Sequence, residues 1–272
     1  MDNSLTTPAD CQCGPRQRPV VESVEPYGAL SVIYDELLGD RFFTELRRAF
    51  QWMIRRYNVR FDSAADVACG TGTFVRYLRD IGAQTVYGVD GSPTMLRRAA
   101  RKNVGNGARF LLQDFRALRL PRPVDLLTCN FDSLNYLRRA ADLSRAFRRF
   151  AENLSPDGHA IFDFVTERST EQSPGSIIER AVGQDRPVIR ITHRDPVRRL
   201  QVARLYLRRA ESVICETHVQ RAYTIPEVIA ALDGSGLRLI AVHDFHNPSR
   251  PPRRAMRAIY LARRANVHSA QK

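Results

Sequence analysis

The chain lacks long apolar runs and a recognisable export signal. No apolar stretch approaches the roughly 18 residues that a membrane-spanning helix needs, so no membrane association is expected. Residues 1–19 contain no basic segment followed by an apolar core, which argues against a secretory signal. We therefore expect a cytoplasmic protein.

Cysteine is scarce, and its spacing is irregular. The odd number and irregular spacing exclude a disulfide framework and match no zinc pattern. Two of the five lie in residues 1–20, a Pro-, Gln- and Gly-rich segment expected to be a flexible leader, where two thiols alone are a weak metal signal. We expect free thiols and no metal site. The five are Cys11, Cys13, Cys69, Cys129 and Cys215.

Lysine is almost absent although the chain is strongly basic. The formal net charge is +13, and all but two of the 42 basic residues, Lys102 and Lys272, are arginine. Such a charge can indicate a nucleic-acid partner. Here, however, arginine pairs recur on nearly every expected helix, which is typical of solvated helix faces and not of one binding stripe. A nucleic-acid partner is therefore not expected.

The order of predicted elements indicates an α/β fold. Expected strands at 64–69, 85–89, 109–112, 124–129 and 160–165 alternate with helices at 73–79, 92–103 and 141–154. This rhythm is typical of a parallel sheet with helices on both faces. After a loop at 172–183, alternation predicts antiparallel strands at 188–194, 200–207 and 213–221. A helix at 226–232 and strands at 237–245 and 255–262 close the chain.

These elements predict a Rossmann-like, seven-stranded, mostly parallel sheet with an antiparallel β insertion after the fifth strand. The length of 272 residues and the composition suit one globular domain. We expect a leader at 1–20, an N-terminal helical lid at 21–60, and a core domain at 61–265 followed by a tail at 266–272. The insertion is expected at 166–222.

Glycines and an acid follow the first two strands. Gly70 and Gly72 come after Asp66 at the end of the first strand and can adopt backbone angles that other residues resist. Asp90 ends the second strand, where a carboxylate can accept two hydrogen bonds from a ribose diol. The pattern predicts a nucleoside pocket at the carboxyl ends of parallel strands.

The acids at the strand ends indicate which nucleoside. Asp66, Asp90, Asp114 and Asp132 all fall at or just past strand ends, where they would repel a pyrophosphate and suit a sulfonium cation. Val75 also stands where a dinucleotide fold needs its third glycine, which disfavours a nicotinamide dehydrogenase. S-adenosylmethionine is the expected cofactor.

The third strand ends in residues suited to adenine. Asp114 can accept from the adenine amino group, Phe115 can pack on the ring, and Met95 is placed to touch its other face.

Residues 61–165 resemble the class I S-adenosylmethionine-dependent methyltransferases in ADVACGTGT, VYGVDGS and LLQDF. The resemblance implies that Gly70 and Gly72 contact the methionine side, that Asp90 binds the ribose, and that Asp114 and Phe115 contact adenine. Ala68 departs from the family, which usually has its first glycine there. The candidate cofactor residues are Asp66, Ala68, Gly70, Thr71, Gly72, Asp90, Gly91, Met95, Gln113, Asp114, Phe115 and Asn130.

A subgroup of small-molecule methyltransferases is similar to the chain in SVIYDELLGD, CNFDSLNYL and ETHVQRAY, so the resemblance extends over about residues 25–264. It implies direct methyl transfer to a nitrogen or oxygen of a small molecule. Because the sulfonium supplies the leaving group, the protein mainly has to align and desolvate the reactants, although a hydroxyl acceptor would benefit from a base.

Two sets of residues are candidates for the acceptor side. Tyr34, Asp132 and Tyr136 are the candidate catalytic residues, expected to act by shaping the acceptor site. Alternation places His218 and Gln220 on one face of the last inserted strand and Arg221 on the other. Core packing and a loop capped by its own side chains are the alternatives. The candidate substrate residues are Asn135, His218, Gln220 and Arg221.

Other functions remain open at this point. An RNA methyltransferase would suit the basic charge, although no Asn-Pro-Pro-Tyr-type loop follows the fourth strand. A non-catalytic S-adenosylmethionine-binding protein is the other alternative. The acceptor, the choice between nitrogen and oxygen, and the oligomeric state stay open, and the inserted strands could form a lid, a substrate wall or a homodimer interface.

Overall fold

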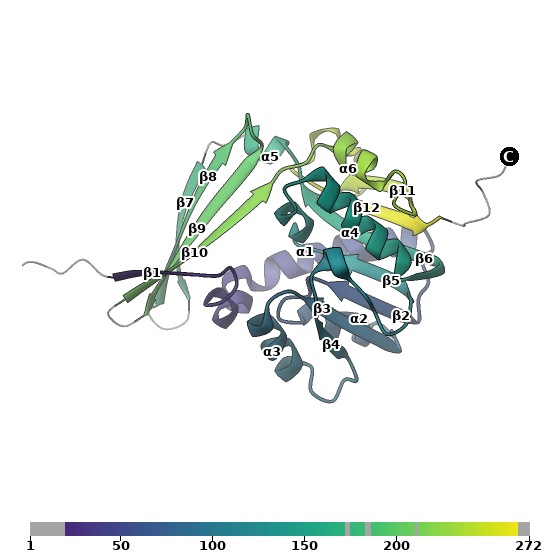
Figure 1. Cartoon of the computed structure of the whole chain (residues 1–272), viewed down its shortest axis with the longest axis horizontal. Helices are drawn as coiled ribbons and strands as arrows, with labels where there is room; N and C mark the ends of the chain where they lie inside the picture. The colour runs from purple at the N-terminus through teal and green to yellow at the C-terminus, as the bar shows by residue number, and fades with distance from the viewer. Residues whose placement is uncertain (1–19, 172–174, 183–185, 210–211, 266–272) are drawn as a thin grey trace, which may run out of the picture.

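Two sheets organise the chain (Figure 1). The computed structural model describes residues 20–265 except 172–174, 183–185 and 210–211. The expectations for Cys11, Cys13, the rest of the leader through residue 19, and the tail at 266–272 lie outside the described residues. No helix within the described ranges is long and apolar enough to cross a membrane.

The larger sheet has seven strands in the order β11-β12-β6-β5-β2-β3-β4. The five neighbouring strands from β6 to β4 pair in parallel, and β12 runs antiparallel to both β6 and β11. This confirms the predicted seven-stranded, mostly parallel sheet. The strands are β2 (Ser63–Val67), β3 (Thr85–Asp90), β4 (Arg109–Leu112), β5 (Val124–Cys129), β6 (Leu154–Val165), β11 (Leu237–Asp244) and β12 (Arg257–Arg264).

The fifth strand is longer than predicted. It was predicted at 160–165, but β6 already begins at Leu154, and its register against β5 shifts between Val124 and Leu126.

Helices cover both faces of this sheet. On one face pack α1 (Tyr34–Arg56), α2 (Thr73–Asp80) and α3 (Pro93–Lys102), and on the other α4 (Ala140–Glu152) and α6 (Ile225–Leu232). Polar caps start two of them, because the Ser92 hydroxyl accepts from Met95 N and Thr224 forms a capping box with Glu227. Short helices complete the chain: η1 (Leu30–Val32), η2 (Phe115–Ala117), η3 (Ser133–Tyr136), α5 (Arg168–Glu171) and η4 (Pro252–Arg254).

The smaller sheet has the order β1-β10-β9-β8-β7 and projects from the α/β core (Figure 1). Its strands are β1 (Val20–Val24), β7 (Gly175–Val182), β8 (Arg186–Asp195), β9 (Leu200–Arg209) and β10 (Ser212–Arg221). β1 pairs in parallel with β10, and the other neighbours are antiparallel.

Two predicted segments are wrong in this sheet. The expected loop at 172–183 forms strand β7 over Gly175–Val182, and the expected helical lid begins with strand β1. Both strands lie at sheet edges, so each has one paired neighbour and a sequence without strict alternation. Pairing with distant strands therefore determines their conformation more than local pattern does.

A small apolar cluster joins the N-terminal segment to the inner face of this sheet. Leu30 and Ile33 pack against Val188, Ala203 and Leu205. The segment between β1 and α1 therefore lies between the smaller sheet and the α/β core.

Candidate active site

The turn after β2 is built from left-handed backbone. Gly70 has φ 54°, Gly72 has φ 76°, and Ala68 has φ 59°. A Cβ at residue 72 would lie 2.7 Å from Asn103 Nδ2, so Gly72 allows α3 to pack closely. Ala68 carries its side chain in a conformation that costs an L residue about 1–2 kcal/mol. This explains why the family that the sequence resembles usually has glycine at this position.

Asp90 at the end of β3 is held by backbone amides. Its Oδ2 accepts from Gly70 N at 2.8 Å, and its Oδ1 accepts from Ser92 N at 2.7 Å. Burial raises the pKa of Asp90, and these hydrogen bonds oppose that effect. Each carboxylate oxygen can accept a second hydrogen bond, so the group retains acceptor capacity for a ribose diol.

Asp66 and Asn130 form a buried polar pair beside the turn. Asp66 accepts from Thr128 Oγ1 at 2.7 Å and from Asn130 Nδ2 at 3.3 Å. Burial raises the pKa of Asp66 to about 7. Asn130 Oδ1 is buried and has no hydrogen-bond partner among the described residues. A buried acceptor of this kind costs free energy until a donor binds it, and a cationic donor would satisfy both residues.

A cavity of about 310 Å³ opens beside this turn. It brings together five of the predicted cofactor residues with Tyr34: Asp66, Ala68, Gly70, Thr71 and Asn130. Lys102 also lines it and contacts Asp35 Oδ2 at 2.5 Å. Sequence reasoning missed Lys102, Asp35 and Phe131.

The predicted adenine-side residues lie outside that cavity. Met95 is buried in the first turn of α3, and Gly91 has open space around its Cα. Asp114 already accepts from Arg116 Nε at 2.9 Å and Nη2 at 2.6 Å, so an adenine amino group would have to share it. Gln113 is bound to both backbone groups of Arg119. Phe115 is half-buried at the start of η2.

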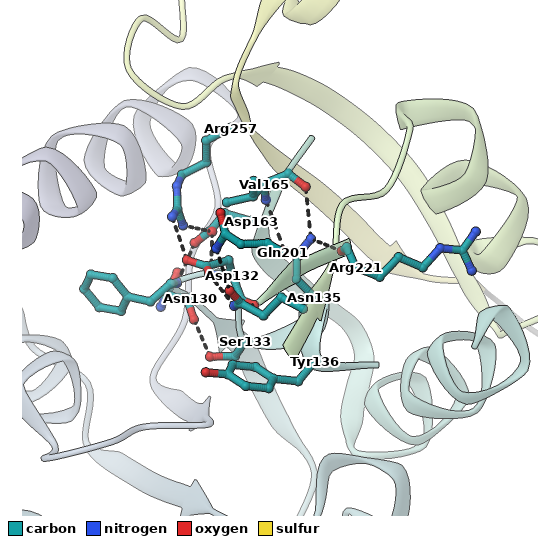
Figure 2. A network of polar contacts seen from close by, with 12 residues as sticks. Asn130, Asp132, Ser133, Asn135, Tyr136, Asp163, Val165, Gln201, Arg221 and Arg257 are labelled. Carbon is teal, nitrogen blue, oxygen red and sulfur yellow. Dashed lines mark hydrogen bonds and ion pairs between the residues drawn. The ribbon is translucent and has the colours of Figure 1, made fainter. Parts of the chain in front are cut away.

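A strained turn follows β5. Phe131 has φ 59° and Asp132 has φ 50°, although neither is glycine. Both amides donate to the carboxylate of Asp163 on β6, at 2.8 and 2.9 Å. Arg257 on β12 then bridges Asp163 Oδ1 at 2.5 Å and Asp132 Oδ1 at 2.6 Å (Figure 2). The predicted catalytic Asp132 is thus held in an ion pair, which favours a positioning role over that of a free base.

Tyr136, at the end of η3, belongs to a hydrogen-bonded chain. Its hydroxyl lies 2.7 Å from Tyr27 Oη and 2.7 Å from His218 Nδ1. His218 Nε2 lies 3.3 Å from Glu216 Oε2. Burial raises the pKa of Tyr136 well above the ordinary value, so its hydroxyl stays neutral.

Glu216 anchors this chain to the N-terminal segment. It is fully buried and accepts from the amides of Tyr27, Ala29 and Leu30 at 2.8, 2.6 and 2.7 Å. Burial alone would raise the pKa of Glu216, but the hydrogen bonds from His218 and these amides outweigh it and hold the pKa below the ordinary value. Glu216 is therefore a carboxylate. Sequence reasoning missed both Glu216 and Tyr27, because only β1 and β10 pairing brings them together.

A second cavity of about 750 Å³ lies between the inner face of the smaller sheet and the α/β core. It brings together four residues predicted for the acceptor side: Asp132, Tyr136, His218 and Gln220. Tyr34 and Phe131 line both cavities, so the two spaces meet at these rings.

Two predicted substrate residues have partners in the backbone and on α6. The Asn135 side chain donates to the carbonyls of Val165 and Arg221 and accepts from Val165 N, which uses it for backbone pairing (Figure 2). The Arg221 side chain extends away from this network and pairs with Glu227 at 2.7 Å (Figure 2). Neither Asn135 nor Arg221 is among the residues that line the cavity, and a substrate contact by either stays a prediction.

Comparison with known proteins agrees with this geometry. Residues 64–158 match the family model described as a methyltransferase domain. The chain is 37% identical over 111 residues to dTDP-3-amino-3,6-dideoxy-alpha-D-glucopyranose N,N-dimethyltransferase of Streptomyces fradiae, covering 41% of this chain and 42% of that protein. Residues 64–158 therefore form a methyltransferase domain.

Solved structures extend the likeness to the whole fold of this methyltransferase. An S-adenosylmethionine-dependent methyltransferase from Clostridium acetobutylicum ATCC 824 has a TM-score of 0.74 at 24% identity, covering 88% of this chain and 99% of that one. The sugar N-methyltransferase KedS8 from Streptoalloteichus has a TM-score of 0.69 at 22% identity, covering 97% and 98%. At these identities the likeness concerns the fold. The match to the Streptomyces fradiae enzyme spans less than half of that enzyme's length.

The cofactor of the methyltransferase is S-adenosylmethionine. The residues present fit it, because the buried acceptor Asn130 Oδ1 and the carboxyl of Asp66 suit its ammonium group, and Asp90 suits its ribose. No cluster of three or more metal-binding side chains occurs within the described residues.

Proposed function

We propose that this methyltransferase transfers a methyl group to an amine of a small molecule held beneath the smaller sheet. The observation that carries the proposal is the meeting of the two cavities at Tyr34 and Phe131. One cavity is lined by Asp66 and Asn130, which suit the ammonium group of the cofactor, and the other is lined by aromatic and polar side chains. The relatives named as sugar N-methyltransferases support nitrogen over oxygen.

The main tasks of the cofactor side are to bind the cofactor and to exclude water. S-adenosylmethionine, when bound, supplies a methyl group activated by its sulfonium. Asp90 would hold the ribose, and Asp66 with Asn130 would hold the ammonium. Tyr34 and Phe131, at the boundary between the cavities, would exclude water from the line of transfer and confine the amine to it.

Hydrogen-bond direction gives Tyr136 its role on the acceptor side. Because Glu216 is a carboxylate, His218 Nε2 donates to it and Nδ1 accepts from the Tyr136 hydroxyl. The Tyr27 hydroxyl then donates to one lone pair of Tyr136 Oη, and the other lone pair can accept an N–H of the substrate amine. After transfer, that nitrogen can release its proton to Tyr136 Oη while the tyrosine proton passes to His218 Nδ1.

The test uses Tyr136→Phe and Asp132→Asn, assayed for S-adenosylhomocysteine release with a panel of amino sugars and small amines. We expect turnover to fall about tenfold, the cost of one lost orienting hydrogen bond, while cofactor affinity is retained. Tyr206→Phe, half-buried on the other face of β9, is the matched control and should keep wild-type turnover.

Unchanged turnover in both variants would contradict the proposal. Methylation of tRNA with a strongly salt-dependent affinity would favour the RNA alternative instead.

A further inference from the structure

Ser169 is a buried serine of the larger cavity whose hydroxyl has no hydrogen-bond partner within the described chain. It lies in the short helix α5, where the chain passes from β6 of the larger sheet to β7 of the smaller sheet (Figure 1). Only 7% of the residue is exposed, and it lines the cavity of about 750 Å³. Among the described residues that line this cavity, only Ser169 has a buried polar side-chain atom without a partner.

The local backbone leaves this hydroxyl unsatisfied. In a helix, serine and threonine commonly donate to the carbonyl three or four residues earlier. The next residue follows this rule, because Thr170 Oγ1 donates to Glu167 O at 2.6 Å. The carbonyl three residues before Ser169, that of Thr166, accepts from Ser169 N at 3.1 Å, and Ser169 Oγ does not bond to it. The hydroxyl is therefore available to a molecule in the cavity.

Hydrogen bonds around α5 fix the backbone that carries this hydroxyl. Just before the helix, Thr166 N donates to Met256 O at 3.0 Å, and Thr166 Oγ1 donates to Ala255 O at 2.6 Å. A side chain on a backbone supported in this way does not have to be ordered when a ligand binds. Its hydrogen bond therefore contributes more to affinity and specificity than one from a mobile loop.

The missing partner indicates what a ligand should supply. A buried hydroxyl without a partner costs free energy, and a ligand without a matching group leaves it unsatisfied. Buried polar groups discriminate between similar substrates in this way. The hydroxyl carries no charge to balance an ionised group, and Arg257 in the same cavity is already paired with Asp132 at 2.6 Å. An uncharged oxygen is therefore the matching group.

We propose that Ser169 is a specificity-determining residue of the acceptor cavity, whose hydroxyl hydrogen-bonds an uncharged oxygen of the methyl acceptor. The inference rests on the proposed function, since it adds a second contact to the one that Tyr136 makes with the amine. Both residues line the same cavity, so one acceptor can present its amine to Tyr136 and its oxygen to Ser169. Ser169 takes no part in the transfer itself, so its loss should raise KM and leave kcat unchanged.

The experiment compares methylation of cyclohexylamine with that of 2-, 3- and 4-aminocyclohexanol, which add one hydroxyl at increasing distance from the amine. Release of S-adenosylhomocysteine by the full chain gives kcat and KM for each amine. We expect the wild-type KM to be about tenfold lower for the best aminocyclohexanol than for cyclohexylamine. Ser169→Ala should remove this difference in KM without changing kcat.

Ser235→Ala is the matched control. Ser235 is also buried, but its Oγ donates to Leu232 O at 2.7 Å, and it is not among the residues that line either cavity. The variant should keep the wild-type KM values and lower the melting temperature by about 2–4 °C, the effect of one lost hydrogen bond. Ser169→Ala should not lower the melting temperature, because the hydroxyl that it removes has no partner.

Four outcomes would overturn the inference: no preference of the wild type for any aminocyclohexanol, the same preference in Ser169→Ala, a change confined to kcat, or a melting temperature lowered as in Ser235→Ala. Failure of the proposed function is distinguishable from these. The wild type would then methylate neither cyclohexylamine nor any aminocyclohexanol, and the inference would fall with it.

Discussion

The cofactor side and the acceptor side of this methyltransferase are assembled at different distances along the chain. Gly70 and Asp90, which define the nucleoside turn, are 20 residues apart. Tyr27 and Glu216, which hold the acceptor side together, are 189 residues apart. Cofactor recognition is therefore encoded in short strand-turn segments, whereas the acceptor space exists only after the smaller sheet has closed on the N-terminal segment.

Glu216→Gln should have the largest effect, because it removes the carboxylate that holds the acceptor side together. An amide cannot accept from three backbone N–H groups and His218 as the carboxylate does, so we expect the free energy of unfolding to fall by about 3 kcal/mol. Denaturant unfolding measures it. Because the pKa of Glu216 is held below its ordinary value, the difference from wild type should be fully present at neutral pH. It should start to decline once the pH falls below the ordinary pKa of glutamate and be lost as the pH falls through the lower pKa of the folded protein.

The control is Glu22→Gln, an exposed residue of β1, which should change stability by less than about 0.5 kcal/mol. Below the unfolding transition, Glu216→Gln should keep its affinity for S-adenosylmethionine. Loss of cofactor affinity in the folded variant would show that the two sides are not independent.

Asp66 should give the cofactor side a pH dependence. The pKa of Asp66 is about 7 because of burial, and a cationic ligand favours the carboxylate, so cofactor binding releases a proton. We expect affinity for S-adenosylmethionine to rise about tenfold per pH unit up to about pH 7 and then level off. Asp66→Asn should remove this slope in calorimetry, and a slope that persists in the variant would contradict the assignment.

In the ligand-free protein, the effect of Asp66 on stability should change with pH in the opposite direction. Burial favours the neutral acid in the folded state, so the contribution of Asp66 to stability declines as the pH rises from 3.8, its ordinary pKa, to about 7.

Ala68→Gly should have the smallest effect, and it tests the backbone strain of the turn on the cofactor side. Glycine removes the steric cost of the left-handed backbone at φ 59°, so we expect a gain of about 1 kcal/mol in the free energy of unfolding. Ala64→Gly, in the extended backbone of β2, should instead lose about 0.5–1 kcal/mol. A loss of stability in both variants would show that the strain at residue 68 does not exist.

The contrast between the two sides also explains what the sequence could predict. The seven-stranded sheet, the turn around Gly70 and the position of Asp90 follow from local patterns of strand, glycine and acid. Alternation also separated His218 and Gln220 from Arg221 correctly. It could not say which face of β10 is turned toward the cavity, so Arg221 was placed among the substrate residues although it pairs with Glu227.

Other partners that the sequence did not reveal have the same physical origin. The sequence shows Asn135 only as a polar residue in a loop. In the structure its side chain donates to the backbone carbonyls of Val165 and of Arg221, at the end of β10. Arg257 and Asp163 carried no local signal, since their partner Asp132 lies on a third segment. Side chains whose partners lie far along the chain are therefore the ones whose contacts the sequence did not predict.

The independence of the two sides is tested most directly by calorimetric titration of S-adenosylmethionine into Asp90→Ala and Tyr136→Phe. Loss of two hydrogen bonds to a carboxylate should weaken binding to Asp90→Ala about 100-fold or more, while Tyr136→Phe should bind as the wild type does. Unchanged binding to Asp90→Ala, or equal losses in the two variants, would contradict the separation of a cofactor side from an acceptor side.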